Sequence, residues 1–327
     1  LRLRVVDPAM GSGHFLVGAC RRLAEYLHDA YRAAVEAHQR QHPDTPALYL
    51  LEEAGIPPEV ARAWDRDEEE VLTTCRLLVA GHCLYGVDKN PLAVELAKVS
   101  LWLATAAHGH PLMFLDHRLR RGDSLLGLSA EDVVKPEAGR SARSVRQARG
   151  VAPGQVLMEE IHDFARRQMR ERIRRALQTI GLLTHHVGDD PGDLEGHRLE
   201  FIALLQTLEP LWRLHEVRVG RRFLPEAHPA ADLALVNRWL DEFGRMDYAS
   251  RDTQNSAEEA RRKGEALGAF CWPLAFPEVF CDADGSWKVD GGFDAALTNP
   301  PWEKVKPDRK EFHAAYDPVI RDFQGRS

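Results

Sequence analysis

The 327-residue sequence lacks several features that mark particular classes of protein. It has no run of about 18 apolar residues and no secretory leader, so we expect no association with a membrane. Its five cysteines have no Cys-x-x-Cys spacing, which argues against a zinc site or a disulfide framework and for a cytoplasmic protein. The formal net charge of −7 gives no overall attraction to a polyanion. A surface for nucleic acid is therefore expected to be local or to lie outside this chain.

The periodicity of apolar residues predicts an α/β fold. Helical patterns begin at Phe15 and cover residues 67–80 and 91–106, and they alternate with short apolar segments that are typical of buried strands. This alternation indicates right-handed crossovers and a parallel sheet. Residues 130–269 interrupt it with long amphipathic helical patterns and no convincing strand. The predicted strands are residues 3–6, 83–88, 117–121 and 293–297.

The stretch DPAMGSGHF, residues 7–15, joins the first predicted strand to the first predicted helix. A turn in this place brings a ligand to the carboxyl edge of a doubly wound sheet. A phosphate-binding P-loop is excluded because no lysine follows Gly13, and a dinucleotide motif fits Gly11 and Gly13 but is broken by Leu16. Two explanations stay open from the loop alone. It is a site for S-adenosylmethionine, which needs close backbone approach without phosphates, or it is a plain tight turn.

Two more acidic residues follow predicted strands. Asp88, in GVDKNP, ends the second strand, and Asp123, in GDSLLG, follows the third. A carboxylate at the tip of the second strand can accept hydrogen bonds from both ribose hydroxyls of a nucleoside, and Asp123 is placed to accept one from an adenine amino group. Each aspartate alone is also typical of a turn or a helix cap. Together with the glycine loop they indicate a nucleoside site.

The tetrad Asn299-Pro300-Pro301-Trp302 follows the fourth predicted strand. With it, the chain resembles the adenine-modifying DNA methyltransferases, whose signature is [N/D/S]PP[Y/F/W]. The resemblance is closest to the large methylases of type IIG restriction–modification fusions and of BREX and DISARM phage-defence systems. It covers residues 1–128 and 270–315, and it rests on the phrases DPAMGSGHFL, YGVDKNPLAVELAKVSLWL, GDSLLG, WPLAFPEVF and FDAALTNPPWE.

The resemblance implies a class I S-adenosylmethionine-dependent methyltransferase, with a Rossmann-like, mostly parallel sheet and helices on both faces. We expect residues 1–129 to form its cofactor-binding half, residues 130–269 a helical insertion, and residues 270–327 its catalytic segment. A sheet of this type has more strands than the four predicted here, and the fourth strand would be an exposed edge. The remaining strands and a target-recognition domain are therefore expected in a larger polypeptide or defence complex.

The family also implies roles for individual residues. Asp88 is expected to hold the ribose of the cofactor, and Asp123 with Ser124 or Leu125 to contact its adenine ring. Asn299 and the carbonyl of Pro300 are expected to accept hydrogen bonds from the target amino group, and Trp302 to stack on the target base. The loop around the methionine part of the cofactor is expected to consist of Asp7, Pro8, Ala9, Gly11 and Gly13.

The chemistry explains why these residue types are needed. The lone pair of an exocyclic amine is delocalised into its ring, so the amine is a poor nucleophile. Two acceptors pull it towards a tetrahedral geometry, and alignment with an activated methyl group supplies much of the catalysis. No covalent nucleophile is required, and the Pro-Cys pair typical of a cytosine C5 enzyme is absent. Reaching the amine in double-stranded DNA requires base flipping, whose unstacking is offset by about 1–3 kcal/mol of stacking on an aromatic side chain.

Two rival functions stay open. Enzymes that methylate a guanine amine in ribosomal RNA or a glutamine of a release factor also use NPP with an aromatic residue. Their chains are compact, so the long segment between GDSLLG and GGFD counts against them. The second rival is a catalytically silent DNA-binding module of a defence complex.

Two other features have a structural and a functional interpretation. The arginines between Arg166 and Arg175 could meet DNA phosphates, but they are at least as well explained as a solvated helix face that pairs with nearby glutamates. His14, beside Gly13, is interpreted as the first residue of a helix, because the expected mechanism needs no base there.

Overall fold

Four short strands form one parallel sheet: β1 (Val5–Asp7), β2 (Leu84–Asp88), β3 (Leu119–Arg121) and β4 (Ala295–Ala296). Their order is β3-β2-β1-β4, so β4 pairs with β1 at one edge, and both residues of β4 are exposed. Each strand overlaps its predicted range, which confirms the expected α/β class. The computed structural model describes residues 2–43, 60, 68–105, 113–129, 132–133, 153–185, 191–224 and 251–299.

Three helices pack together on one face of the sheet: α1 (His14–Gln41), α4 (Glu68–His82) and α5 (Pro91–Thr105). The buried positions of α1 include Leu16, Cys20 and Ala24, which recur every four residues and so share one side of the helix. These side chains join residues of β1 and β2 in one hydrophobic core. The prediction that His14 starts a helix is confirmed.

The segment around residues 270–280 covers the other face of the sheet. It contains two single-turn helices, α11 (Trp272–Ala275) and α12 (Pro277–Phe280), each with proline near its start. The ring of Phe276 lies 5.2 Å from that of Tyr85 on β2, and both side chains are fully buried. The aromatic residues of this segment therefore form a second core against the strands.

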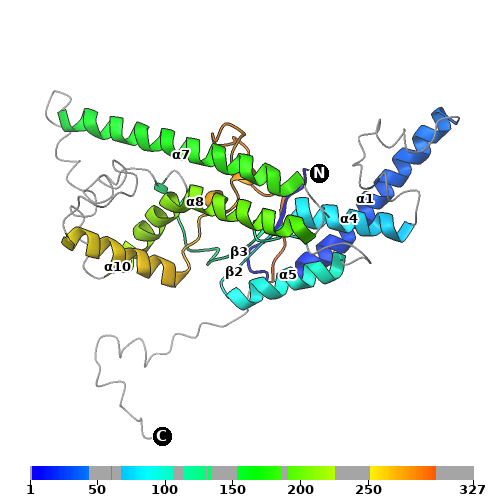
Figure 1. Cartoon of the computed structure of the whole chain (residues 1–327), viewed down its shortest axis with the longest axis horizontal. Coiled ribbons are helices and arrows are strands. Elements are labelled where there is room, and N and C mark those ends of the chain that lie inside the picture. Colours follow the sequence, from blue (N-terminus) through cyan, green and yellow to red (C-terminus); the bar gives the residue numbers. More distant parts are fainter. Residues whose placement is uncertain are drawn as a thin grey trace, which may run out of the picture.

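Three long helices separate β3 from β4 in the sequence: α7 (Pro153–His185), α8 (Pro191–Arg221) and α10 (Arg251–Leu267). In Figure 1 they lie on one side of the strands, while α1, α4 and α5 gather on the other. α8 packs against both α7 and α10. Ile173 on α7 and Leu208 on α8 belong to their shared core. Within the described ranges, none of the helices combines the length and apolar character that crossing a bilayer requires.

Candidate functional site

The carboxyl edge of the sheet brings the predicted acidic residues together. Asp7 and Asp88 are the last residues of β1 and β2, and Asp123 comes two residues after β3. These strands are parallel neighbours, so the three residues follow one edge of the sheet. The backbone N–H of Gly11 donates to Asp88 Oδ2 at 2.8 Å, which ties the glycine loop to the end of β2.

The two glycines of this loop have left-handed backbones, with φ of 53° at Gly11 and 81° at Gly13. A side chain is strained at either position. At Gly13 a Cβ atom would lie 3.1 Å from the Cα of Ala97 on α5. This glycine therefore allows the start of α1 to pack closely against α5. At Gly11 a Cβ atom would meet nothing within 4 Å. Gly11 therefore leaves open space at the sheet edge, whereas Gly13 serves the fold.

Asp7 has one oxygen without a hydrogen-bond partner in the described part of the chain. Its side chain is 1% exposed, and Oδ1 accepts the backbone N–H of Ala9 at 3.0 Å. Oδ2 is buried and has no partner there. Burial raises the pKa of Asp7, and the nearby charge of Asp88 raises it further, against the lowering effect of the Ala9 bond. A cation or a hydrogen-bond donor brought to this oxygen would stabilise the charged form of Asp7.

The Asp88 carboxylate is held by backbone groups on both sides. Its Oδ1 accepts the N–H of Asn90 at 2.8 Å, and its Oδ2 accepts that of Gly11. Each carboxylate oxygen has a further lone pair, so both can still accept a hydroxyl. Asp88 is thus fixed in place at the tip of β2 and retains acceptor capacity, as a group that holds ribose hydroxyls requires.

Asp123 and Ser124 belong to a loop, residues 122–128, that is held by the segment after α10. The N–H of Asp123 donates to the carbonyl of Gly268 at 2.7 Å, and its Oδ2 pairs with Lys89 at 3.1 Å. The indole N–H of Trp272 donates to the carbonyl of Ser124 at 3.1 Å. Sequence reasoning missed Trp272, because it lies 148 residues from Ser124.

The strand that leads to the tetrad lies directly beside β1. Val6 of β1 is in register with Ala296, and its carbonyl accepts the N–H of Leu297 at 2.8 Å. Asn299 is exposed and follows β4 by three residues, at the same carboxyl edge as Asp7. The other three residues of the tetrad, Pro300 to Trp302, lie outside the described residues.

A cavity of about 330 Å³ lies beside β3, next to the loop of residues 122–128. Arg121 and Gly122 line it from the sheet, and Trp212 and Glu216 line it from α8. Burial raises the pKa of Glu216, while the neighbouring Arg261 opposes that rise. The helical insertion therefore borders the sheet edge at the third strand.

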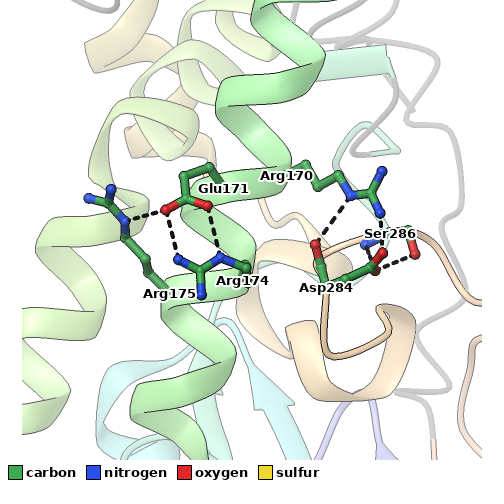
Figure 2. A network of polar contacts seen from close by, with 6 residues as sticks. All are labelled: Arg170, Glu171, Arg174, Arg175, Asp284 and Ser286. Atoms are coloured by element: carbon green, nitrogen blue, oxygen red, sulfur yellow. Dashed lines mark hydrogen bonds and ion pairs between the residues drawn. The ribbon is translucent and has the colours of Figure 1, made fainter.

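Four arginines of α7 have partners within the protein, and Figure 2 shows three of them, Arg170, Arg174 and Arg175. Glu171 accepts hydrogen bonds from Arg174 at 2.8 and 2.9 Å and from Arg175 at 2.8 Å, which lowers its pKa to about 2. Arg170 pairs with Asp284 in the turn before β4, and Arg172 donates to the carbonyl of Thr207 on α8. Arg166 and Arg167 are exposed. The contacts favour a structural role for these four paired arginines.

Comparison with known proteins identifies the family. The profile of the Eco57I restriction-modification methylase family matches residues 82–323, nearly three quarters of the sequence. The chain belongs to this family. The match includes Asp88, Asp123, the helical insertion and the tetrad, and it begins after the glycine loop.

One relative within the curated proteins is similar over most of the sequence. It is a protein of Methanocaldococcus jannaschii whose name assigns it to type II restriction enzymes and methyltransferases, and it is 29% identical over 95% of this Eco57I-type chain. The chain spans 23% of that relative's length. No solved structure matches the chain significantly.

Proposed function

We propose that this chain is the catalytic segment of a DNA methyltransferase that transfers a methyl group from S-adenosylmethionine to the exocyclic amine of adenine. The observation that carries this proposal is the sheet edge itself. The glycine loop and two strand-end carboxylates meet there, and the strand leading to Asn299 joins the same sheet beside β1. Membership of a restriction-modification methylase family supports a role in marking DNA.

The residues at this edge fit the proposed cofactor. The buried Asp7 Oδ2 lacks a partner in the described residues, and it would accept the cationic methionine end. The open space at Gly11 leaves room for that end to approach the backbone. Asp88 would bind the ribose hydroxyls, and the loop of Asp123 and Ser124 would contact the adenine ring. When bound, S-adenosylmethionine supplies a methyl group that is already activated by its positive sulfur.

The protein's part in the reaction is to hold the target amine. The side-chain oxygen of Asn299 and the carbonyl of Pro300 would accept its two N–H groups and localise its lone pair. Trp302 would stack on the flipped base and offset part of the unstacking, by about 1–3 kcal/mol. Alignment of the amine with the methyl group is then the main catalytic effect. No side chain is needed as a nucleophile.

Labelled S-adenosylmethionine tests this function directly. Wild-type protein and the Asn299→Ala variant would be incubated with double-stranded DNA, ribosomal RNA and release factor. We expect adenine in DNA to be labelled by the wild type, and loss of one acceptor to lower the rate by about 100- to 1,000-fold. Label in RNA or release factor would instead identify the rival substrates. DNA binding without any methylation would identify a silent module.

The cofactor and the surroundings of the chain need separate measurements. We expect S-adenosylmethionine to raise the melting temperature of the protein, since a ligand that binds only the folded state stabilises it. No shift at millimolar ligand would refute the proposed cofactor. We further propose that the chain acts in the cytoplasm as part of a larger polypeptide or defence complex, which supplies target recognition. Sequencing of modified bases with and without the gene would reveal the recognition site.

A further inference from the structure

Side chains of α8 and α11 hold the loop of residues 122–128 through hydrogen bonds. His215 of α8 is fully buried, and its Nε2 accepts the backbone N–H of Leu128 at 3.1 Å. At the other end of the loop, Trp272 of α11 donates its indole N–H to the carbonyl of Ser124. Two side chains far away in the sequence thus hold the backbone on both sides of the loop.

Backbone contacts also hold this loop. The N–H of Phe270 donates to the carbonyl of Leu126 at 2.8 Å, and Asp123 bonds to Gly268. A Cβ atom at Gly122 would lie 2.3 Å from the Phe270 ring, and one at Gly127 would lie 1.9 Å from the Phe270 carbonyl oxygen. Only glycine allows an approach this close. The two glycines of GDSLLG therefore serve the contact with Phe270, which directly follows the insertion.

The ionisation of His215 agrees with its role as an acceptor. Burial, with a contribution from the charge of Arg222, lowers the pKa of His215 to about 4. The imidazole is therefore neutral at physiological pH, and the tautomer with its proton on Nδ1 leaves the Nε2 lone pair to accept the Leu128 N–H. Its ring also contacts that of Trp212, which in turn contacts Phe270, so the three rings form one packed group.

We propose that His215 and Trp272 are positioning residues, through which the helical insertion and the segment that follows it set the place of the loop of residues 122–128. This inference rests on the proposed function, in which Asp123 and Ser124 contact the adenine ring of S-adenosylmethionine. Neither His215 nor Trp272 needs to touch the cofactor. Each fixes a backbone group of the loop, and the loop then presents the Asp123 carboxylate in one orientation.

A matched pair of tryptophan variants tests the hydrogen bond to Ser124. Trp272→Phe removes the donated N–H and keeps an aromatic ring. Trp212→Phe makes the same chemical change in the same aromatic group, but Trp212 Nε1 has no hydrogen-bond partner among the described residues. By calorimetry on the full chain, we expect Trp272→Phe to weaken S-adenosylmethionine binding by about tenfold, as the loss of one hydrogen bond predicts. Trp212→Phe should stay within about twofold of the wild type. Equal losses in both variants would overturn the proposal.

A second pair of variants tests His215 by comparing a substitution that removes the hydrogen-bond acceptor with one that restores it. His215→Leu leaves the Leu128 N–H without an acceptor, whereas His215→Gln supplies an amide oxygen in its place. We expect the affinity for S-adenosylmethionine to fall with leucine and to recover largely with glutamine. In methylation assays, KM for the donor should rise in His215→Leu and Trp272→Phe while kcat is unchanged. A merely structural role would lower kcat through loss of folded protein and leave KM alone, which would contradict the inference.

Hydrogen exchange separates failure of this inference from failure of the proposed function. In protein without any ligand, the amides of Asp123 and Leu128 should exchange faster in His215→Leu and Trp272→Phe than in the wild type. Faster exchange together with unchanged donor affinity would refute the positioning role alone. A wild-type protein that binds no S-adenosylmethionine would refute the proposed function, while the exchange data would still report how the loop is held.

Discussion

Carboxylates at the sheet edge and carboxylates on the helical insertion lie in opposite electrostatic settings. At the edge, Asp7 is buried with one oxygen unpartnered in the described residues, and its pKa is raised. On the insertion, Glu171 and Glu258 each bind two arginines of their own helix, and the pKa of each is lowered to about 2. The first arrangement opposes folding at neutral pH, and the second supports it.

This difference indicates two roles for charged groups in this molecule, one in stability and one in ligand binding. Along α7 and α10, charged side chains pair with one another on the surface. These ion pairs add a little to stability and help solubility. A buried carboxylate with a spare lone pair is a poor stabiliser, and groups of this kind are common at ligand sites. Substitutions in the two regions should therefore change different properties of the protein.

The largest effect on stability is expected in the core of the insertion. Ile173 is fully buried between α7 and α8, and Ile173→Ala should lower the free energy of unfolding by about 2–5 kcal/mol. Because Ile173 belongs to the helical core, donor affinity below the melting temperature should stay as in the wild type. Denaturant unfolding and calorimetry measure the two quantities. A large loss of affinity would show that packing between α7 and α8, and not only the hydrogen bonds of His215 and Trp272, holds the loop of residues 122–128.

Asp7→Asn should change stability and binding in opposite directions. The raised pKa means that the folded state binds its proton more tightly than the unfolded state does. The stability contributed by this group therefore falls as the pH rises above its ordinary value of 3.8. We expect Asp7→Asn to melt at a higher temperature than the wild type at pH 7, and the difference to vanish towards pH 3.

The same variant should bind S-adenosylmethionine more weakly, by about 100-fold, because it loses the charge opposite the cationic methionine end. The exposed Asp290 supplies the control, since Asp290→Asn should alter neither melting nor binding. Unchanged affinity in Asp7→Asn would remove Asp7 from the cofactor site. A lower melting temperature would mean that its carboxylate has a stabilising partner.

The paired glutamates should show the reverse dependence on pH. Their lowered pKa values mean that the stability they contribute is present above the ordinary pKa of 4.5, and is lost as the pH falls towards 2. A Glu171→Gln, Glu258→Gln variant should melt slightly below the wild type at pH 7, and the gap should close near pH 2. High salt should also narrow the gap, because both glutamates are near the surface. A gap that is unaffected by salt would argue against ion pairing as its cause.

The smallest effect is expected at the ion pair between α7 and the turn before β4. Arg170 and Asp284 are both more than half exposed, so Arg170→Ala should lower the melting temperature only slightly. A double-mutant cycle with Asp284→Ala would measure the coupling between them. The salt dependence of DNA binding should be the same in Arg170→Ala as in the wild type. A shallower dependence would restore the phosphate-binding interpretation of this helix face.

The parts of the fold that could be predicted from the sequence are those with local signals. Strand, glycine turn and helix follow one another within residues 5–16, and buried apolar residues mark β1 and β2. The positions of Asp7, Asp88 and Asp123 on one edge then follow from parallel pairing alone. The family resemblance rests on the sequence motifs at these strand ends and on a tetrad whose last three residues lie outside the described ranges.

The remaining contacts could not be predicted because their partners have no local pattern in common. Leu128 and His215 are 87 residues apart, and nothing in the spacing of α8 distinguishes a histidine that accepts a backbone N–H from one that fills a core. The same is true of Trp272, which reads as an ordinary aromatic anchor in an apolar segment. The unpartnered oxygen of Asp7 also depends on burial by residues from several elements.

The pairing of β1 with β4 has a consequence for the synthesis of this protein on the ribosome. Arg4 donates its backbone N–H to Asp294, 290 residues later, at the start of the only contact that β4 makes in the described sheet. At a synthesis rate of about 5–20 residues per second, β4 emerges on the order of 15–60 s after β1. The strand that carries Asn299 to its place therefore completes the described sheet last, and the glycine loop can form first.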